Sequence, residues 1–422
     1  MSTHVRSTPK RTYQIWIEQS ILGSHIDAYN SYLIEQGYAD TTICFYLHSV
    51  AHFSHWLTRK KIDIHRIDEA LVRSFVTVHL PACDCAGRCE HCSESVRAAL
   101  GHLLRVLRLK GHIPPPCTGT VSPATQGELE HFDAYLDKVC GLASKTRVVR
   151  LHYVSKFLQR TFKRRPIDLT RLTPTDIQRF VTRHGEGCAR GSIQVICSCL
   201  RTYLRFRAFK GERTEALMAA VPSILNWRLA SLPKALTNEE LRQFLAAFDR
   251  TSCIGQRDYA MARCLVDLGL RAGEVAGLRL ENFDWREGTL RIVSTKGGRQ
   301  HLLPLPVETG RAIVQYLQNA RPKCASRSLF IRRLAPRDRP LNAGIVRWAM
   351  RCAYMRSGLS RPWSGTHILR HTVACRLINS GVALKDIADV LRHRSLDTTT
   401  IYTKIDLTSL SAVALPWPGR TS

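Results

Sequence analysis

The chain has 422 residues, of which 44% are hydrophobic and 23% are charged. This length is too great for one compact core and predicts about three units, while the composition excludes a globally disordered chain. Lys and Arg number 62 against 34 Asp and Glu, and the net charge of +28 favours a nucleic-acid partner over a merely basic soluble protein.

Secretion and membrane spanning are disfavoured. The first residues lack an apolar signal core, no stretch of about 18 apolar residues occurs, and no amphipathic lysine-rich helix or lipidation motif suggests a membrane partner. The 15 cysteines are an odd number, and most lie inside apolar helical stretches, as Cys197 and Cys264 do. This pattern indicates reduced thiols and a cytoplasmic setting rather than a disulfide framework.

Residues 26–111 and 129–211 are predicted to be two copies of one helical unit. Short motifs recur in the same order with similar gaps, which chance similarity between two helical stretches does not explain. The pairs are Tyr32-Leu33 with Tyr135-Leu136, LHSVAHF with LHYVSKF, IDIHRI with IDLTRL, SFVTVH with RFVTRH, and LLRVLRLKG with YLRFRAFKG. Each copy ends in an arginine-rich helix, which is either a solvated face or a set of phosphate contacts.

The first copy carries an insertion before its last helix, CDCAGRCEHC, with Cys83, Cys85, Cys89 and Cys92. Cysteines this close together can ligate zinc, but the spacing C-x-C-x3-C-x2-C matches no familiar finger pattern and no second pair follows at the usual distance. A cysteine-rich loop without metal is therefore favoured, with a zinc site as the alternative.

A boundary is expected after the second copy. Pro233 interrupts any helix there, and Thr237 with Glu240 forms a capping box that opens a new one. The predicted division is a helical arm with the cysteine-rich insertion (1–118), a helical domain (119–215), a linker (216–236) and a third unit (237–422).

The third unit is predicted to be α+β. It starts helical, and then Leu278–Phe283, Leu290–Thr295 and His301–Leu305 show strand patterns separated by glycine-containing turns, before helices return. The fold class is therefore multidomain and mainly α, with two repeated helical units followed by an α+β unit that holds a small antiparallel sheet.

Polar residues that packing alone does not explain occur at intervals in the third unit. Arg271 lies between two apolar helical stretches, where Glu274 can hold its guanidinium. Lys296 lies at the tip of a hairpin, where a solvated turn lysine is the ordinary explanation. Neither residue is specific when taken alone.

Two later motifs add to this set. In THILRH, His367, Arg370 and His371 share one face of a helix. A metal site would exclude a fixed cation among its ligands, so an oxyanion such as phosphate fits this cluster better. In LRHRSLDTTTIYTK, His393 precedes Tyr402 across a polar turn. A lone tyrosine is usually structural, so the order of the whole set carries the prediction.

The order Arg, Lys, His-x-x-Arg, His, Tyr closely resembles that of the tyrosine recombinases, or phage integrases. GLRAGEVAGL resembles the family's first arginine box, HILRH its second and LRHRSLDTTTIYTK its third, so the resemblance covers the third unit nearly end to end. The chain departs from the family at Arg392, where glycine is usual, and after Tyr402, where Thr-Lys replaces Thr-His or Ser-His. Neither departure removes a catalytic group.

The helical repeat fits the same family. The second copy resembles its SAM-like core-binding domain, which clasps DNA opposite the catalytic domain, and the first copy resembles an additional arm of that kind. The duplication places the chain nearer to transposon-borne or plasmid-borne integrases than to the short Xer proteins.

The resemblance implies a site-specific recombinase that cuts and rejoins double-stranded DNA for integration or transposition of a mobile element. Tyr402 would attack the phosphorus and form a 3′-phosphotyrosyl link, with no cofactor, ATP or metal. The roles implied for the other residues are phosphate binding by Arg271, Arg370 and His393, protonation of the leaving oxygen by Lys296, and removal of the tyrosine proton by His367.

The resemblance also implies an assembly. Four protomers, identical or mixed with a partner recombinase, would meet on two DNA sites at the nucleoid of a bacterial cytoplasm. The apolar tail LTSLSAVALPWP either docks on a neighbouring protomer or covers its own core.

Two alternatives stand beside this interpretation. A type IB topoisomerase shares the chemistry but relaxes DNA, and the duplicated arm and the integrase-like boxes argue against it. A non-catalytic DNA-binding accessory protein is disfavoured because every active-site position is filled.

Overall fold

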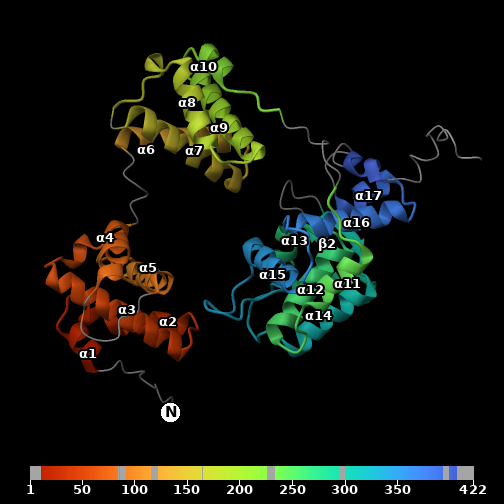
Figure 1. Cartoon of the computed structure of the whole chain (residues 1–422), viewed down its shortest axis with the longest axis horizontal. Coiled ribbons are helices and arrows are strands. Elements are labelled where there is room, and N and C mark those ends of the chain that lie inside the picture. Colours follow the sequence, from red (N-terminus) through yellow and green to blue (C-terminus); the bar gives the residue numbers. More distant parts are fainter. Residues whose placement is uncertain are drawn as a thin grey trace, which may run out of the picture. The chain divides into compact units, whose positions relative to one another are not determined.

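The structure is a computed structural model that describes residues 11–83, 85, 92–115, 122–163, 165–225, 233–293, 300–392 and 399–405. The described chain is mainly helical and contains one three-stranded sheet (Figure 1). It divides into two compact units, one of Met1–Pro116 with Ser231–Ser422 and the other of Cys117–Ala230. A search of the described residues finds no helix with the length and apolarity to cross a membrane.

The N-terminal helices surround a core of their own, which includes Phe53, Phe75 and Leu100. They are α1 (Arg11–Glu18), α2 (Ile26–Glu35), α3 (Asp40–Arg59), α4 (Glu69–Ser74) and α5 (Ser93–Leu109). After α4 the chain forms a π-helical turn, Phe75–His79, and then a short 3-10 turn, Leu80–Ala82. The chain therefore leaves the regular α-helix just before the cysteine-rich segment.

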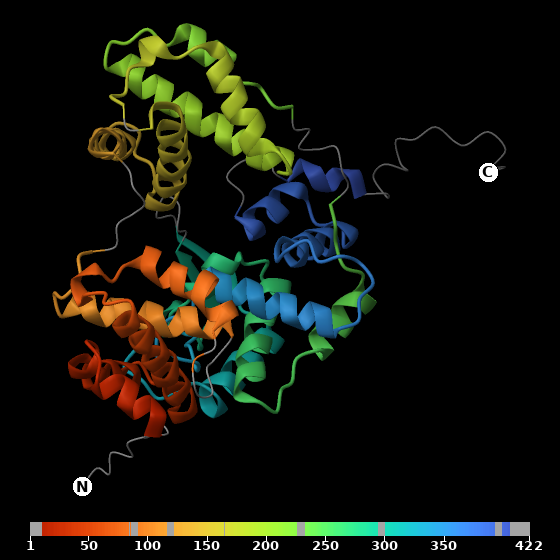
Figure 2. The same ribbon diagram turned by 60° about the vertical axis from the view of Figure 1, so that its left-hand side comes forward.

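The second unit repeats this order of helices, which confirms the predicted repeat. Its helices are α6 (Pro123–Lys138), α7 (Ser144–Phe162), α8 (Pro174–Gly185), α9 (Arg190–Phe209) and α10 (Glu215–Ala220), with α7 packed against α9 (Figure 2). Phe157 and Phe180 are buried at the positions that match Phe53 and Phe75. Leu217 and Val221 also belong to this core, so the second unit continues past the predicted start of the linker at residue 216.

The third part is built around α12, which packs against α14, α15 and α16. Its elements are α11 (Asn238–Ala246), α12 (Cys253–Asp267), α13 (Ala272–Ala276), β1 (Phe283–Asp284), β2 (Thr289–Val293), β3 (Gln300–Pro304), α14 (Val307–Asn319), α15 (Ala343–Arg356), α16 (His367–Asn379) and α17 (Leu384–Leu391). Several apolar side chains of α12, including Met261 and Cys264, are fully buried. They hold α16, which carries the candidate site, in a fixed place.

The predicted small antiparallel sheet is confirmed. The strand order is β1-β2-β3, and Leu290 of β2 pairs with Phe283 on one side and Leu303 on the other. The strand predicted for residues 278–283 is wrong over most of its length, because Leu280–Asn282 forms a 3-10 turn. The Asn282 side chain accepts a hydrogen bond from the Arg279 backbone N–H at 2.8 Å, and this bond closes the turn.

Candidate active site

Helix α16 begins with the predicted cluster. His367, Arg370 and His371 lie in its first turns at i, i+3 and i+4, so they share one face. Arg370 is only 5% exposed, and its guanidinium donates to the backbone carbonyl oxygens of Gly269 and Leu391. Two loops that are far apart in the sequence are therefore bound to α16 by one side chain.

The guanidinium of Arg370 is held in an unfavourable electrostatic environment. Burial, followed by the charges of Arg271 and Arg392, lowers the pKa of Arg370 to about 9. The group stays charged at neutral pH, but burial and two neighbouring cations oppose that charge. An entering anion would relieve this cost.

Arg271 stands immediately before α13 and caps it together with Glu274. The backbone N–H of Arg271 donates to Glu274 Oε2 and its guanidinium donates to Glu274 Oε1, both at 2.8 Å. Glu274 is buried, whereas the Arg271 side chain is 42% exposed. The carboxylate thus anchors the guanidinium while leaving it open to an incoming ligand.

The turn before Arg271 requires its glycine. Gly269 has a φ of +57°, and a Cβ there would lie 2.7 Å from a methyl carbon of Leu391. Its carbonyl oxygen accepts bonds from both Arg370 and Arg392. The close approach of these loops therefore depends on the missing side chain.

Arg392 stands where the family usually has glycine, and the structure explains how the arginine is accommodated. It ends α17 in the left-handed conformation, with φ 55° and ψ 48°, for which glycine is normally favoured. Its buried guanidinium donates to Glu274 Oε2 at 3.0 Å and to the carbonyl of Val390 at 2.7 Å. These bonds offset the backbone strain and add another cation to the network.

The carboxylate of Glu274 links Arg271 to Arg392 in one network of hydrogen bonds. Burial alone would raise the pKa of Glu274, but Arg392 and the bonds from Arg271 hold it below its ordinary value. Glu274 therefore stays ionised and bridges the two guanidiniums, and Gly269 links Arg392 to Arg370. Three arginines from three separate segments meet in this way.

Tyr402 lies beside the same helix. It belongs to a 3-10 segment, Thr400–Ile405, and is 2% exposed, with its ring in an apolar cluster that includes Val373, Ile387 and Leu391. Its hydroxyl is 2.7 Å from Nδ1 of His371. The phenol is therefore covered by protein in this conformation.

The hydrogen bond between Tyr402 and His371 joins two uncharged side chains. Burial, partly offset by Arg370, raises the pKa of Tyr402 to about 12. Burial and then His367 and Arg370 lower the pKa of His371 to about 4. At neutral pH both partners are uncharged. The sequence assigned the tyrosine proton to His367, whereas the imidazole bonded to the hydroxyl here is that of His371.

Several predicted site residues are thus placed and two are not described. His367 begins α16 three residues before Arg370, and burial, followed by the charges of Arg370 and Arg271, lowers the pKa of its imidazole. Lys296 falls in residues 294–299 and His393 in residues 393–398, both outside the described residues. Sequence reasoning did not anticipate the roles of His371 and Arg392, although the HILRH face and the missing glycine were the available signals.

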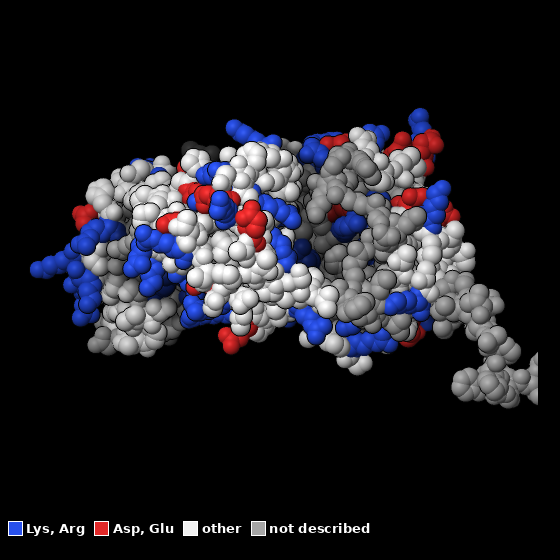
Figure 3. All heavy atoms as spheres, turned by 90° about the horizontal axis from the view of Figure 1, so that it is seen from above, with Lys and Arg blue, Asp and Glu red and all other residues white. Residues whose placement is uncertain are grey.

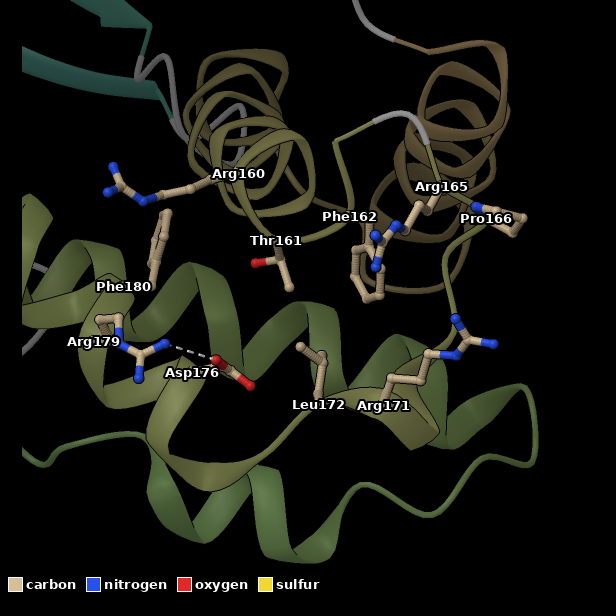
Figure 4. Close-up of a pocket in the computed structure, with 10 residues that line it drawn as sticks. All are labelled: Arg160, Thr161, Phe162, Arg165, Pro166, Arg171, Leu172, Asp176, Arg179 and Phe180. Atoms are coloured by element: carbon tan, nitrogen blue, oxygen red, sulfur yellow. Dashed lines mark hydrogen bonds and ion pairs between the residues drawn. The ribbon is translucent and has the colours of Figure 1, made fainter.

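A second basic feature lies in the second helical unit. A cavity of about 330 Å³ is lined by the end of α7, the following segment and the start of α8. Figure 4 shows four exposed arginines around it, Arg160, Arg165, Arg171 and Arg179. The cavity also contains Asp176, which accepts a bond from Arg179 at 3.2 Å. The lining therefore carries a net positive charge.

Comparison with known proteins identifies the family to which the chain belongs. The profile of the phage integrase family matches residues 234–408, and that of the phage integrase N-terminal SAM-like domain matches residues 129–211. A Sinorhizobium fredii protein named as an integrase/recombinase, y4rA, is 33% identical over 397 residues, 94% of each chain. This chain belongs to the tyrosine recombinase, or phage integrase, family. The family consists of site-specific DNA recombinases.

Two further relatives bear on the architecture of this recombinase. The tyrosine recombinase XerA of Thermococcus onnurineus is 26% identical over 283 residues, 67% of this chain and 92% of its own. Among solved structures, a lambda integrase tetramer bound to a Holliday junction matches with a TM-score of 0.54 at 18% identity, over 78% of this chain and 89% of that one. The predicted fold class is confirmed.

Proposed function

We propose that this recombinase cuts DNA by attack of Tyr402 on a backbone phosphorus. The phenolic oxygen forms a bond to phosphorus, the bond to the 5′ oxygen breaks, and a 3′-phosphotyrosyl link and a 5′-hydroxyl result. The reverse attack by a 5′-hydroxyl of another strand rejoins the DNA without an external energy source. The observation that carries the proposal is the convergence of Arg271, Arg370 and Tyr402 on α16.

The guanidiniums are suited to the charge that develops on phosphorus. Arg271 is exposed and Arg370 is buried, so one can meet the phosphate as it arrives while the other holds it against the protein. Each offers a planar set of donors to the non-bridging oxygens. Preorganised donors of this kind stabilise a transition state strongly because they need not reorient during the reaction. Lys296 as the general acid and His393 as a further phosphate ligand complete the proposed set.

In the described conformation the Tyr402 side chain is buried and is not positioned to attack a phosphate. Tyr402 must leave its apolar cluster, or the segment that bears it must shift, before the hydroxyl reaches a phosphorus. We propose that His371 holds the hydroxyl until then. His367, about one helical turn away along α16, would take the proton during attack.

The rest of the chain is proposed to bind the duplex. The net charge of +28 supports this, and basic side chains are spread over the face drawn in Figure 3. The arginine-lined cavity of the second unit would contact backbone phosphates, which position a protein on DNA without reading its sequence. Following the lambda integrase tetramer and the integrase name of y4rA, we propose four protomers on two sites of a mobile element in a bacterial host.

A covalent-trapping experiment tests the proposal. The full chain would be incubated with duplexes taken from the DNA that flanks its own gene, each carrying a nick that lets the cleaved end diffuse away. Wild type and Tyr259→Phe should both form a denaturant-resistant protein–DNA adduct. Tyr259 is the matched control, because it is partly buried and stacks with Arg250 through a ring that phenylalanine keeps. Tyr402→Phe should form no adduct, and an undiminished adduct in that variant would refute the assignment.

A further inference from the structure

Two imidazoles and two thiols converge in the N-terminal helical part, which contributes none of the residues of the candidate recombinase site. His52 lies in α3, His79 ends the π-helical turn, and Cys83 and Cys85 follow it. Nε2 of His52 is 3.2 Å from Nε2 of His79 and 3.2 Å from Sγ of Cys83, and Sγ of Cys85 is 3.7 Å from Nε2 of His79. The ligating atoms of all four residues lie within 4.8 Å of one another.

These separations fit a tetrahedral zinc ion. With Zn–N bonds of about 2.05 Å and Zn–S bonds of about 2.3 Å, the edges of the tetrahedron are about 3.3 Å between nitrogens, about 3.6 Å between nitrogen and sulfur and about 3.8 Å between sulfurs. The distances of 3.2, 3.2 and 3.7 Å given above lie within about 0.5 Å of the corresponding edges, and the remaining pairs of ligating atoms lie within 4.8 Å of one another. Two thiolates and two neutral imidazoles also cancel the charge of the ion and are the donors that zinc prefers.

A hydrogen-bond network explains this arrangement less well. One nitrogen of His52 faces both His79 Nε2 and Cys83 Sγ at the same distance. A ring nitrogen has either one N–H or one lone pair in the ring plane, so it makes one well-aligned hydrogen bond. A metal ion at the centre accepts a lone pair from every member of the cluster at once.

The backbone is shaped to bring His79 into the cluster. The π-helical turn at Phe75–His79 changes the direction in which the following side chains point, and such turns are frequent at functional sites. Phe75 itself packs edge-on against the His52 ring, with centroids 5.1 Å apart. His52 is 1% exposed, so this ligand is fixed before any ion arrives.

The second helical unit provides an internal comparison. By the motif matches that define the repeat, His184 corresponds to His79 and Lys156 to His52. Cys83 and Cys85 lie in the insertion, outside the matched motifs, although Cys188 follows His184 at the same interval as Cys83 follows His79. The second copy keeps a regular helix, α8, in place of the π-helical turn, and His184 bonds the carbonyl of Phe180 at 3.1 Å. The π-helical turn and the complete ligand set thus occur together in the first copy.

We propose that the first helical unit binds a zinc ion through His52, His79, Cys83 and Cys85. Four protein ligands leave no open coordination position, so the ion is structural and not catalytic. It ties α3 to the segment that precedes α5, and its binding free energy adds to the stability of this unit. This proposal replaces the metal-free loop favoured by the sequence and differs from an all-cysteine site, because two of its ligands are histidines.

Metal analysis of the full chain tests the proposal. The protein, purified without a histidine tag and dialysed against a weak chelator, should retain one zinc ion per chain by mass spectrometry. His79→Gln, Cys83→Ser and Cys85→Ser should lose it, while the matched variants His184→Gln and Cys188→Ser of the second copy should keep it. Folded wild type without zinc would overturn the proposal.

Two further measurements separate the ligand sets and guard against misfolding. A Cys89→Ser, Cys92→Ser double variant should keep its zinc, and loss there with retention in His79→Gln would overturn the proposal in favour of an all-cysteine site. Wild type reconstituted with Co²⁺ should show the visible bands of a tetrahedral ion and a thiolate charge-transfer band, which octahedral Co²⁺ bound to surface groups lacks. Bands of octahedral Co²⁺ alone would contradict the tetrahedral site.

Discussion

Arg392→Gly replaces a buried arginine with the residue that its left-handed backbone conformation favours. Relief of that conformation stabilises the variant by about 1–2 kcal/mol. The opposing effect is larger, because removing one partner of a buried ion pair costs about 3–5 kcal/mol. Glu274 keeps both of its bonds to Arg271 in the variant, so the lower limit of this range, about 3 kcal/mol, applies to the lost ion pair. We expect a net loss of about 1–2 kcal/mol for Arg392→Gly and about 3 kcal/mol for Arg392→Ala, which keeps the strain.

Native-state hydrogen exchange of the α17 amides in the full chain measures this effect, since a chain of several units does not unfold in one step. A loss of about 1–2 kcal/mol corresponds to exchange roughly 5- to 30-fold faster in Arg392→Gly. Arg242→Ala, which removes an exposed arginine of α11, should leave α17 unchanged. Equal or greater protection in Arg392→Gly would show that the bonds to Glu274 contribute less than the strain, and would refute the reasoning.

Three other predictions concern the site and the DNA surface. In His371→Ala the rate of adduct formation should stay within about tenfold of the wild-type rate, whereas in His367→Ala it should fall by about 10²–10⁴-fold. An equal loss of rate in both variants would mean that His371 is the base. Because burial lowers the pKa of His371 to about 4 from its ordinary 6.5, the unfolded chain binds more protons between these values. The free energy of opening of the α16 amides, measured by native-state hydrogen exchange, should therefore fall as pH drops from 6.5 towards 4, and less steeply in His371→Gln; an identical slope would contradict this. Arg160→Ala and Arg165→Ala should each reduce the salt dependence of DNA binding by about one counterion, measured by titration at several salt concentrations, and unchanged slopes would exclude the cavity from the interface.

The helical repeat and the α16 cluster could be predicted because both follow from local spacing. Apolar residues at helical intervals place Val154 and Phe157 in a core whatever lies around them. Likewise, residues at i, i+3 and i+4 share a helix face in any context, so His367 and Arg370 were certain to be neighbours once the helix formed.

Features that depend on tertiary contacts could not be predicted in this way. The left-handed turn at Arg392 is acceptable only because Glu274, far away in sequence, receives its guanidinium. The choice of His371 over His367 as the partner of Tyr402 depends on how the Thr400–Ile405 segment packs. The thiol of Cys83 approaches His52, which lies in α3 and is separated from the cysteine-rich segment by α4, so the spacing of the cysteines alone does not reveal this contact.

The arginine network makes the site respond to anions before any chemistry occurs. The described network contains three guanidiniums, those of Arg271, Arg370 and Arg392, and one carboxylate, that of Glu274, which is bonded to Arg271 and Arg392. It therefore carries excess positive charge. A bound dianion should stabilise the fold around it, since a ligand that binds only the native state adds to the free energy of opening. Sulfate should therefore slow amide exchange at the start of α16 more than chloride does at equal ionic strength. Because sulfate also stabilises folded proteins in general, α9 of the second unit is the internal reference. Equal slowing in both helices would mean that the three guanidiniums do not form an anion site in the absence of DNA.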